Sequence, residues 1–321
     1  MSKVTVRCGN WTSSSAVPAR QAVLDYSPGV LDWATGWLGN AVLVNGQVHP
    51  VATFEPAVLR LRLLNGSTAR ILNPTLSDGR MFWRIGTDGG LLDAPVAVPS
   101  VLLAPGERVE VLLDQTRDGG TSVGFVSAPF SGAASSMMSG GSGAPAQRAG
   151  FDLLRFNVTA PLAGSAGVKP AAFAPIIRHD PNLAAQRSRV FESTCRHGMS
   201  GMNGMNGAWH RINGLLYDGA RIDFNVPLTQ LESWQFVNRS DEPHPMHLHG
   251  THFQVLSRSG VALPTARGWK DTELVRSQET VQIALRFGVA GTYVLHCRNL
   301  GHEDKGMMHC CPVKCRTNSI G

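Results

Sequence analysis

Short runs in which apolar and polar side chains alternate are the feature that most restricts the fold of this 321-residue chain. One run, residues 58–64, reads Val-Leu-Arg-Leu-Arg-Leu-Leu and stops at an Asn-Gly pair. Another run, residues 108–113, places Val109 and Val111 on one face and charged residues on the other. A period of two predicts strands with one buried face, and Asn-Gly pairs predict tight turns.

The same pattern recurs along the chain, and no segment predicts a helix longer than about three turns. Further strands are expected at residues 41–48, with an Asn-Gly turn inside, and at 151–158, 209–216, 232–238, 253–256, 281–287 and 292–297. The 35 Gly and 19 Pro, with only 16% charged residues, favour a turn-rich β protein. We therefore expect an all-β fold with two β-sandwich or barrel domains.

Two segments of biased composition divide the chain. Residues 131–149 are rich in Gly, Ser, Ala and Met and predict a surface loop. Residues 161–188 are rich in Ala and Pro near their start and predict an interdomain linker. The expected organisation is a first domain of residues 1–160, this linker, and a second domain of residues 189–321.

Charge and hydropathy argue against two classes of function. The formal net charge is +6, but the basic residues are scattered and form no run interleaved with aromatics, which argues against nucleic-acid binding. No apolar run approaches the length of a membrane span. Residues 1–8 lack the apolar core of a secretory signal, and the compartment stays open.

Two segments in the last quarter of the chain are rich in residues that bind transition metals. The set comprises His244, His247, His249, His296, Cys297, His302 and Met307. Two histidines, a thiolate and a weak axial thioether are the ligands of an electron-transfer copper. Zinc also binds Cys and His, but a methionine at this spacing favours copper.

Strand periodicity divides these ligands between two sites. Residues two apart share a face, so His247 and His249 point one way, and His244 can point the other. In the second segment Cys297 points away from His296. We therefore expect one copper site from His244, Cys297, His302 and Met307, beside a second site from His247, His249 and His296.

The juxtaposition of Cys297 and His296 predicts a short covalent path for electrons between the two sites. Glu303 directly follows His302 and is a candidate for relaying protons to the second site.

Other residues near these segments are weaker candidates. Met199, Met202 and Met205 lie in a Gly- and Asn-rich stretch and are candidate thioether ligands that recruit Cu(I). The alternative is a loop without this role. Asp241 and Glu242 precede the first histidine and could tune it or bind a substrate cation, or serve only as solvated loop charges.

The motifs that carry these ligands resemble those of multicopper oxidases, in particular the bacterial laccase and cuprous oxidase branch. The resemblance rests on residues 244–253 (HPMHLHGTHF) and 296–308 (HC, then HEDKGMM), and it continues upstream in residues 36–46, 61–70 and 87–92. It implies two cupredoxin-like Greek-key domains, which resemble the second and third domains of the family. It also implies one-electron oxidation of a small-molecule or metal-ion donor, coupled to reduction of O₂ to water.

The resemblance assigns a role to each ligand. Type 1 copper would be held by His244, Cys297, His302 and Met307. Type 2 copper would be held by His247, and the type 3 pair by His249 and His296, with Glu303 as proton donor. The family is mostly periplasmic or secreted.

Two departures from the family pattern bear on activity. The family cluster takes two His-x-His pairs from its first domain, and no remaining histidine of this sequence lies in such a pair. The family reads His-Cys-His where this chain has Arg298, whose guanidinium has no lone pair for copper. We therefore expect impaired oxidase turnover unless another chain supplies the missing domain.

Two alternatives to an oxidase follow from the same departures. One is a mononuclear blue-copper electron-transfer or copper-binding protein, and the other is a copper-free structural relative. Residues 309–319 are rich in Cys and look unlike the apolar strand that ends family members. Together with the absent first domain and Arg298, this ending suggests a fragment or a decaying gene product.

Overall fold

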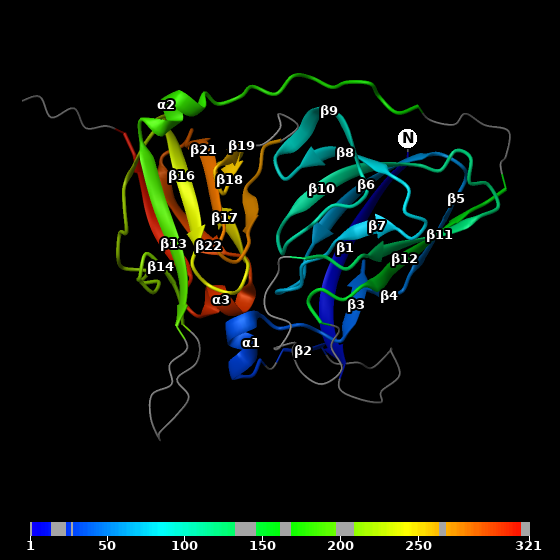
Figure 1. Cartoon of the computed structure of the whole chain (residues 1–321), viewed down its shortest axis with the longest axis horizontal. Coiled ribbons are helices and arrows are strands. Elements are labelled where there is room, and N and C mark those ends of the chain that lie inside the picture. The colour runs from blue at the N-terminus through cyan, green and yellow to red at the C-terminus, as the bar shows by residue number, and fades with distance from the viewer. Residues whose placement is uncertain are drawn as a thin grey trace, which may run out of the picture.

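Four β-sheets in two pairs make up the protein (Figure 1). The structure is a computed structural model that describes residues 2–13, 24–26, 28–131, 146–160, 168–196, 209–262 and 268–315. One pair of sheets is built from residues before 160 and the other from residues after 187. The expected all-β fold with two sandwiches is therefore confirmed.

The first sandwich contains strands β1 to β12. Their bounds are β1 Ser2–Ser13, β2 Leu24–Asp25, β3 Ala41–Val44, β4 Gln47–Val48, β5 Val51–Phe54, β6 Val58–Asn65, β7 Pro74–Leu76, β8 Phe82–Thr87, β9 Gly90–Val98, β10 Arg108–Asp114, β11 Ser122–Ser127 and β12 Phe151–Val158. The larger sheet has the order β4-β3-β1-β6-β10-β8-β9, with β2 beside β1, and the smaller has the order β5-β12-β11-β7.

The second sandwich contains strands β13 to β23. Their bounds are β13 Ser188–Arg196, β14 Trp209–Ile212, β15 Val226–Pro227, β16 Leu231–Asn238, β17 His244–Leu248, β18 Phe253–Arg258, β19 Val261–Ala262, β20 Thr272–Val275, β21 Thr280–Arg286, β22 Gly291–Cys297 and β23 Met308–Lys314. The sheet orders are β14-β13-β16-β21-β18-β19 and β15-β23-β22-β17-β20.

Alternation in the sequence accounts for the cores. In β10 the predicted inward residues Val109 and Val111 are buried, and they join the core of the first sandwich with Phe125 and Phe156. A second core forms separately in the other sandwich. The turn between β3 and β4 follows the predicted Asn-Gly pair, with positive φ angles of 52° and 82° that suit a tight hairpin.

Three short helices complete the described structure: α1 Val30–Thr35, α2 Pro181–Ala185 and α3 Leu300–Asp304. Helix α1 precedes the main strands of the first sandwich, and α3 follows β22 of the second. The two helices pack against each other, and Figure 1 shows them together at the base of the molecule between the sandwiches. This contact brings the start of the chain to the ligand-rich segment near its end.

The structure differs from the sequence expectations in two places. The view that residues 309–319 lack a strand was wrong for the described part, because β23 pairs with β22 and buries most of its side chains. Residues 181–185, assigned to the linker, form α2, whose Ala184 packs on Leu231 and Ala284 of the second sandwich. The division at residues 160 and 188 remains a prediction.

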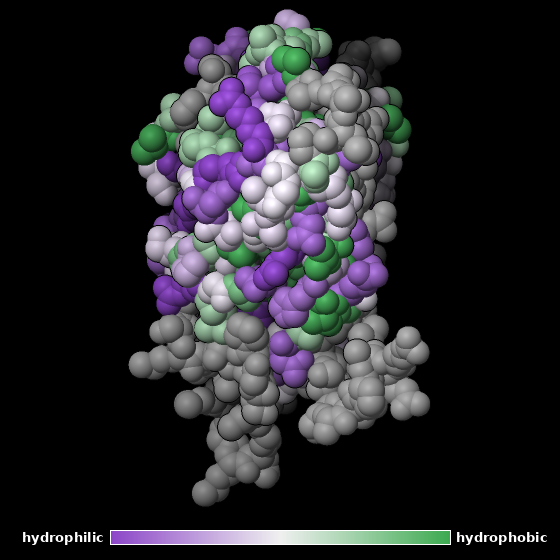
Figure 2. Space-filling model, turned by 90° about the vertical axis from the view of Figure 1, so that its right-hand side faces the viewer, coloured by the Kyte–Doolittle hydropathy of each residue, from purple (hydrophilic) through white to green (hydrophobic). Residues whose placement is uncertain are grey.

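Figure 2 shows one face of the outer surface, on the side of the first sandwich. Polar side chains dominate there, and apolar ones occur in small separate patches. Within the described residues, no helix is long and apolar enough to cross a membrane.

Candidate metal centre

Two neighbouring strands carry the ligand-rich segments. Strands β17 and β22 run antiparallel, with Met246 opposite Cys297 and His247 opposite His296. Residues directly opposite each other share a face of the sheet, so His247 and His296 lie on one face and Cys297 lies on the other. The expected alternation therefore brings the ligands together as two clusters.

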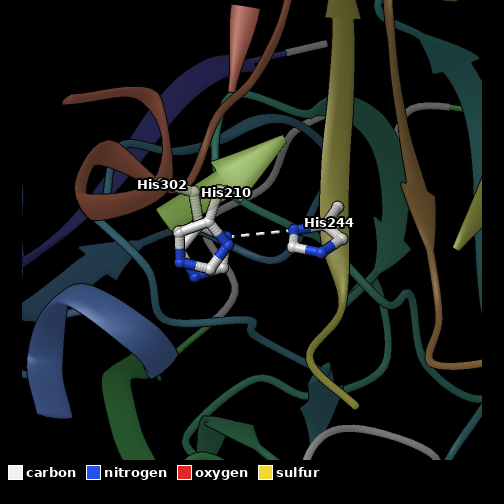
Figure 3. Close-up of side chains that lie close together, drawn as sticks. All are labelled: His210, His244 and His302. Atoms are coloured by element: carbon white, nitrogen blue, oxygen red, sulfur yellow. Dashed lines mark hydrogen bonds between the residues drawn. The ribbon is translucent and has the colours of Figure 1, made fainter. Parts of the chain in front are cut away.

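The first group, which we call the cysteine cluster, consists of His244, Cys297 and His302. The Cys297 sulfur lies 3.7 Å from Nδ1 of His244 and 3.7 Å from Nδ1 of His302. The two Nδ1 atoms are 3.0 Å apart, and this contact is the dashed line in Figure 3. All three side chains are completely buried. These spacings leave room for one ion bonded to all three atoms at about 2.0–2.3 Å.

Hydrogen bonds fix which nitrogen of each imidazole faces the sulfur. His302 donates from Nε2 to the carbonyl oxygen of Ala34 at 3.0 Å, and Nε2 of His244 lies 2.7 Å from the Ser240 hydroxyl. Because the Nε2 atoms are engaged, the Nδ1 atoms are left as metal ligands. The backbone N–H of Asn299 also donates to the Cys297 sulfur at 3.4 Å.

Burial sets the protonation states of the cysteine cluster without a metal. It lowers the pKa of His244 and of His302 well below the ordinary value, so both imidazoles are neutral and keep a lone pair. Burial also raises the pKa of the Cys297 thiol far above its usual range. Binding of a metal ion would therefore release the thiol proton.

Met307 is the expected fourth member of this site. Its side chain is fully buried in the same core cluster as Cys297. The backbone N–H of Cys297 donates to the Met307 carbonyl at 3.2 Å, and the Met307 N–H donates to the His302 carbonyl at 3.1 Å. The loop therefore returns the chain to Cys297 after α3, and Met307 would be the fourth residue to hold a metal ion there.

His210 belongs to this neighbourhood and was missed by the sequence analysis. It lies on β14, is fully buried, and stacks on the His302 ring with centroids 3.8 Å apart (Figure 3). Its Nε2 donates to the Trp33 carbonyl at 2.9 Å and lies 4.0 Å from the Cys195 sulfur. Nothing in the local sequence signals this contact, because it depends on how β14 packs against α3.

Helix α1 closes the cysteine cluster from the side of the first sandwich. Three consecutive carbonyls at its end accept hydrogen bonds: Trp33 from His210, Ala34 from His302, and Thr35 from the Asn299 amide at 3.4 Å. Carbonyls at a helix C-terminus lack partners within the helix. These hydrogen bonds therefore give partners both to the α1 carbonyls and to the buried side-chain N–H groups. We call this arrangement the α1 cap.

The second group, the three-histidine cluster, consists of His247, His249 and His296. Their ligand atoms lie within 4.8 Å of one another, and Nε2 of His249 is 3.0 Å from Nε2 of His296. Nδ1 of His247 donates to the Asp271 carbonyl at 2.8 Å, and Nδ1 of His296 donates to the Cys297 carbonyl at 2.9 Å. This cluster therefore presents Nε2 atoms and can hold a metal ion.

A cavity of about 310 Å³ opens beside this cluster. It is lined by His247, Leu248, His249, Gly250, Thr251, His252 and Asp271. Burial, the neighbouring histidines and the charge of Arg298 together lower the pKa of His249 to about 4. The imidazole is therefore neutral at ordinary pH, as a metal ligand must be.

Ion pairs from the first sandwich support the three-histidine cluster. Arg108 on β10 contacts Asp271 through two hydrogen bonds of 2.7 and 2.6 Å. Asp271 holds His247 through its carbonyl, and its own pKa is lowered because these bonds and the Arg108 charge outweigh burial. Next to it, the mostly buried Lys270 pairs with Glu107 at 2.6 Å and with Glu273 at 2.9 Å.

Arg298 and Glu303 lie at the edge of the three-histidine cluster. Arg298 follows Cys297 and packs its side chain against Gly106, where an added Cβ would lie 3.0 Å from the Arg298 Cγ. The carboxylate of Glu303 lies 3.2 Å from Nδ1 of His296. Burial raises the Glu303 pKa, but His296 and Arg298 outweigh it, so the net shift is downward and the carboxylate form is favoured.

The three candidate Cu(I)-recruiting methionines, Met199, Met202 and Met205, lie outside the described residues. Asp241 and Glu242 precede β17, and burial with the Asp241 charge raises the Glu242 pKa to about 7.

The fold is a pair of β-sandwiches, and the cysteine cluster offers a set of side chains that suits copper. Residues 193–315 match the family model described as multicopper oxidase. The chain is 32% identical over 293 residues to a laccase of Bacillus subtilis, covering 84% of this chain and 53% of that protein. The structure matches the McoA multicopper oxidase of Aquifex aeolicus with a TM-score of 0.80 and 29% identity, covering 97% of this chain and 66% of that one.

The chain belongs to the multicopper oxidase family, whose cofactor is copper, and it has a cupredoxin-like fold. It spans about half the length of the curated relatives that it matches. These relatives also include a cell division protein FtsP of Yersinia pestis, 29% identical over 280 residues, covering 84% of this chain and 54% of that protein. The proteins that this chain is similar to therefore include some that are not named as oxidases.

Proposed function

We propose that this chain is an oxidoreductase that takes single electrons from a small donor at a type 1 copper held by the cysteine cluster. The observation that carries the proposal is the position of the Cys297 sulfur, 3.7 Å from the Nδ1 atoms of both His244 and His302. One thiolate, two imidazoles and a buried methionine suit copper in single-electron transfer. Phenols and cuprous ion are the proposed classes of donor.

Electrons would leave this site through the backbone of β22. Cys297 and His296 are adjacent residues, and the His296 imidazole donates to the Cys297 carbonyl at 2.9 Å. The path from the sulfur to the three-histidine cluster is therefore covalent over most of its length. In the family-like reaction, four such electrons reduce O₂ to water at copper bound there.

O₂ reduction requires more metal ligands than the three-histidine cluster contains. The three-histidine cluster offers one ligand set, and Arg298 adds a positive charge beside it. We propose that a complete oxygen-reducing cluster requires histidines from another domain or chain. The second candidate function is accordingly electron transfer or copper binding without oxidase turnover. It is favoured by Arg298 and by the similarity to a protein named for cell division.

Loading the protein anaerobically with Cu(I), followed by reoxidation, tests both candidates. An intense visible copper–thiolate band with one copper per chain and no O₂ consumption would support electron transfer at the cysteine cluster. Several coppers per chain, with O₂ consumption in the presence of hydroquinone, would support oxidase turnover by the chain alone. Copper binding without the visible band would contradict the type 1 assignment.

A further inference from the structure

A cavity of about 480 Å³ opens on the outer face of the smaller sheet of the first sandwich. It is lined by residues of β5, β11 and β12, by the turn before β5, and by Ser77 directly after β7. Figure 1 shows this sheet on the right, away from both metal clusters, and Figure 2 looks onto this side of the molecule. The cavity is therefore separate from the copper ligands.

A glycine at the centre of the sheet helps to form this cavity. Gly124 on β11 lies opposite Arg155 on β12, which in turn lies opposite Val51 on β5. On its other side, the Gly124 N–H donates to the Ser77 hydroxyl at 3.0 Å, and the Ser77 N–H donates to the Gly124 carbonyl at 2.8 Å. An added Cβ at Gly124 would lie 3.1 Å from the Ser77 Oγ. Glycine inside a strand often marks a place where a ligand approaches closely.

A β-bulge in β12 brings two opposite charges to the cavity. Asp152 and Arg155 are an odd number of residues apart, so in a regular strand they would point to opposite faces. The pairing of β12 with β11 skips Leu153, and both Leu153 and Leu154 are buried in the core. As a result, Asp152 and Arg155 are both exposed and both line the cavity. Bulges commonly redirect side chains in this way.

The protein itself neutralises neither of these charges. Across the residues that the structure describes, the side chains of Asp152 and Arg155 have no hydrogen-bond or ion-pair partner. In contrast, Arg80 of the same sandwich pairs with Asp78 at 2.7 Å and with Asp118 at 2.6 Å. A cation and an anion that line one cavity without contacting each other suit a ligand that carries both charges.

Aliphatic side chains and one imidazole complete the lining. Val51 is 55% exposed, Val126 is partly buried, and both line the cavity. His49 has a φ of +45°, which is rare outside glycine and persists where the surrounding structure holds it, often at binding sites. The carbonyl of the next residue, Pro50, accepts a hydrogen bond from the Arg155 N–H at 3.0 Å. The turn that carries His49 is therefore attached to β12.

We propose that this cavity binds a small zwitterion of the amino-acid class with an aliphatic side chain. The ligand carboxylate pairs with the Arg155 guanidinium, whose planar fork matches a carboxylate, and the ligand ammonium pairs with Asp152. The aliphatic part packs on Val51 and Val126. This site does not depend on copper at either cluster, so it goes beyond the proposed oxidoreductase function.

Amide NMR of the full chain tests the site with three probes. L-Leucine carries both charges, 4-methylpentanoate lacks the ammonium group, and 3-methylbutylamine lacks the carboxylate. Leucine should shift the amide resonances of residues 122–127 and 151–158 in a saturable manner, with a Kd of about 1 mM or lower. Each of the other two probes should bind about tenfold more weakly, because one charge pair is lost.

Two substitutions should separate the roles of the two charges. Arg155→Gln should weaken the binding of leucine and 4-methylpentanoate about tenfold and leave that of 3-methylbutylamine unchanged. Asp152→Asn should weaken the binding of leucine and 3-methylbutylamine and leave that of 4-methylpentanoate unchanged. Arg117→Gln is the control, because Arg117 is an exposed arginine of the same sandwich that does not line the cavity. It should bind all three probes as the wild type does.

A third substitution fills the cavity itself. Gly124→Val should abolish saturable binding of all three probes, while chemical denaturation shows a folded protein, since valine is favoured in strands. The site would be overturned by a wild type without saturable leucine shifts, by equal affinities for the three probes, or by unchanged leucine binding in Arg155→Gln. An equal loss in Arg117→Gln would show unspecific charge attraction and would overturn it as well.

Discussion

The two ligand clusters lie back to back on β22, yet the first sandwich supports them by different means. The cysteine cluster is enclosed by the α1 cap, whose backbone carbonyls accept hydrogen bonds from neutral imidazoles. The three-histidine cluster is supported by ion pairs such as Arg108 with Asp271, and a cavity opens beside it. The first is built to exclude water around one ion, whereas the second is built to admit ligands.

The difference also appears in the tautomers. Backbone and hydroxyl groups engage Nε2 in the cysteine cluster and leave Nδ1 for a metal. In the three-histidine cluster the carbonyls of Asp271 and Cys297 accept from Nδ1 and leave Nε2. The carbonyls of Ala34 and Cys297 belong to α1 and β22, and that of Asp271 directly precedes β20, so orientation of the ligands is a property of the fold. Changes on one side should therefore leave the other side functional.

Removal of the thiol should have the largest effect. In Cys297→Ser the copper–thiolate band should disappear completely, because the hydroxyl does not replace a soft thiolate ligand. The three-histidine cluster should still bind one equivalent of copper, measurable by metal analysis. Cys311→Ser is the control, since Cys311 is a fully buried thiol of the same core but lies outside both clusters. A visible band retained in Cys297→Ser would disprove the assignment.

A substitution at Gly36, directly after α1, tests the contribution of the α1 cap separately. Its φ is +98°, and an added Cβ would lie 2.3 Å from the Ala69 Cβ and 2.5 Å from the Asn299 amide nitrogen. Gly36→Ala should lower the free energy of unfolding by about 3 kcal/mol, through backbone strain and overpacking.

The control for this change is Gly46→Ala. Gly46 also has positive φ, at +82°, but nothing lies within 4 Å of an added Cβ. Chemical denaturation measures both stabilities, and copper titration should show weaker binding at the cysteine cluster only in Gly36→Ala. Equal losses of copper affinity in the two variants would mean that the α1 cap does not support the cysteine cluster.

The ionic support of the second cluster should give a smaller loss. Arg108→Leu removes both hydrogen bonds to Asp271 and leaves this mostly buried carboxylate without its main partner. We expect about 2 kcal/mol lower stability and about tenfold weaker metal binding at the three-histidine cluster.

Isothermal titration with Cu(II) on the Cys297→Ser background isolates this cluster. Arg62→Leu is the control, because Arg62 is 61% exposed and pairs with Glu110 at 3.3 Å on the surface. If the two arginine variants bind copper equally, Asp271 would not need Arg108 to orient His247.

Features of the fold that depend on residues close together in the sequence could be predicted, whereas contacts between distant segments could not. Strands such as β10 and β12 follow from local alternation, and the two-sided placement of His247 and Cys297 follows from the period of two. By contrast, the stacking of His210 on His302 and the α1 carbonyls depend on tertiary packing between distant segments. No local pattern marks them. The strand β23 was missed because its cysteines were treated as atypical, although they pack as small apolar side chains.

Substitution of Arg298 should have the smallest effect, and this effect should be confined to the three-histidine cluster. The Arg298 charge is one of the causes that lower the pKa of His249, so Arg298→His removes a repulsion that also opposes a bound cation. Copper should bind the three-histidine cluster about fivefold more tightly, the equivalent of about 1 kcal/mol. The visible band of the cysteine cluster should stay unchanged, because Arg298 lies on the other face from Cys297.

O₂ consumption should not appear in Arg298→His, since one more histidine does not supply two His-x-His pairs. Oxygen-electrode measurements with hydroquinone decide the point: turnover in Arg298→His would show that the chain already holds every other ligand its oxygen chemistry needs.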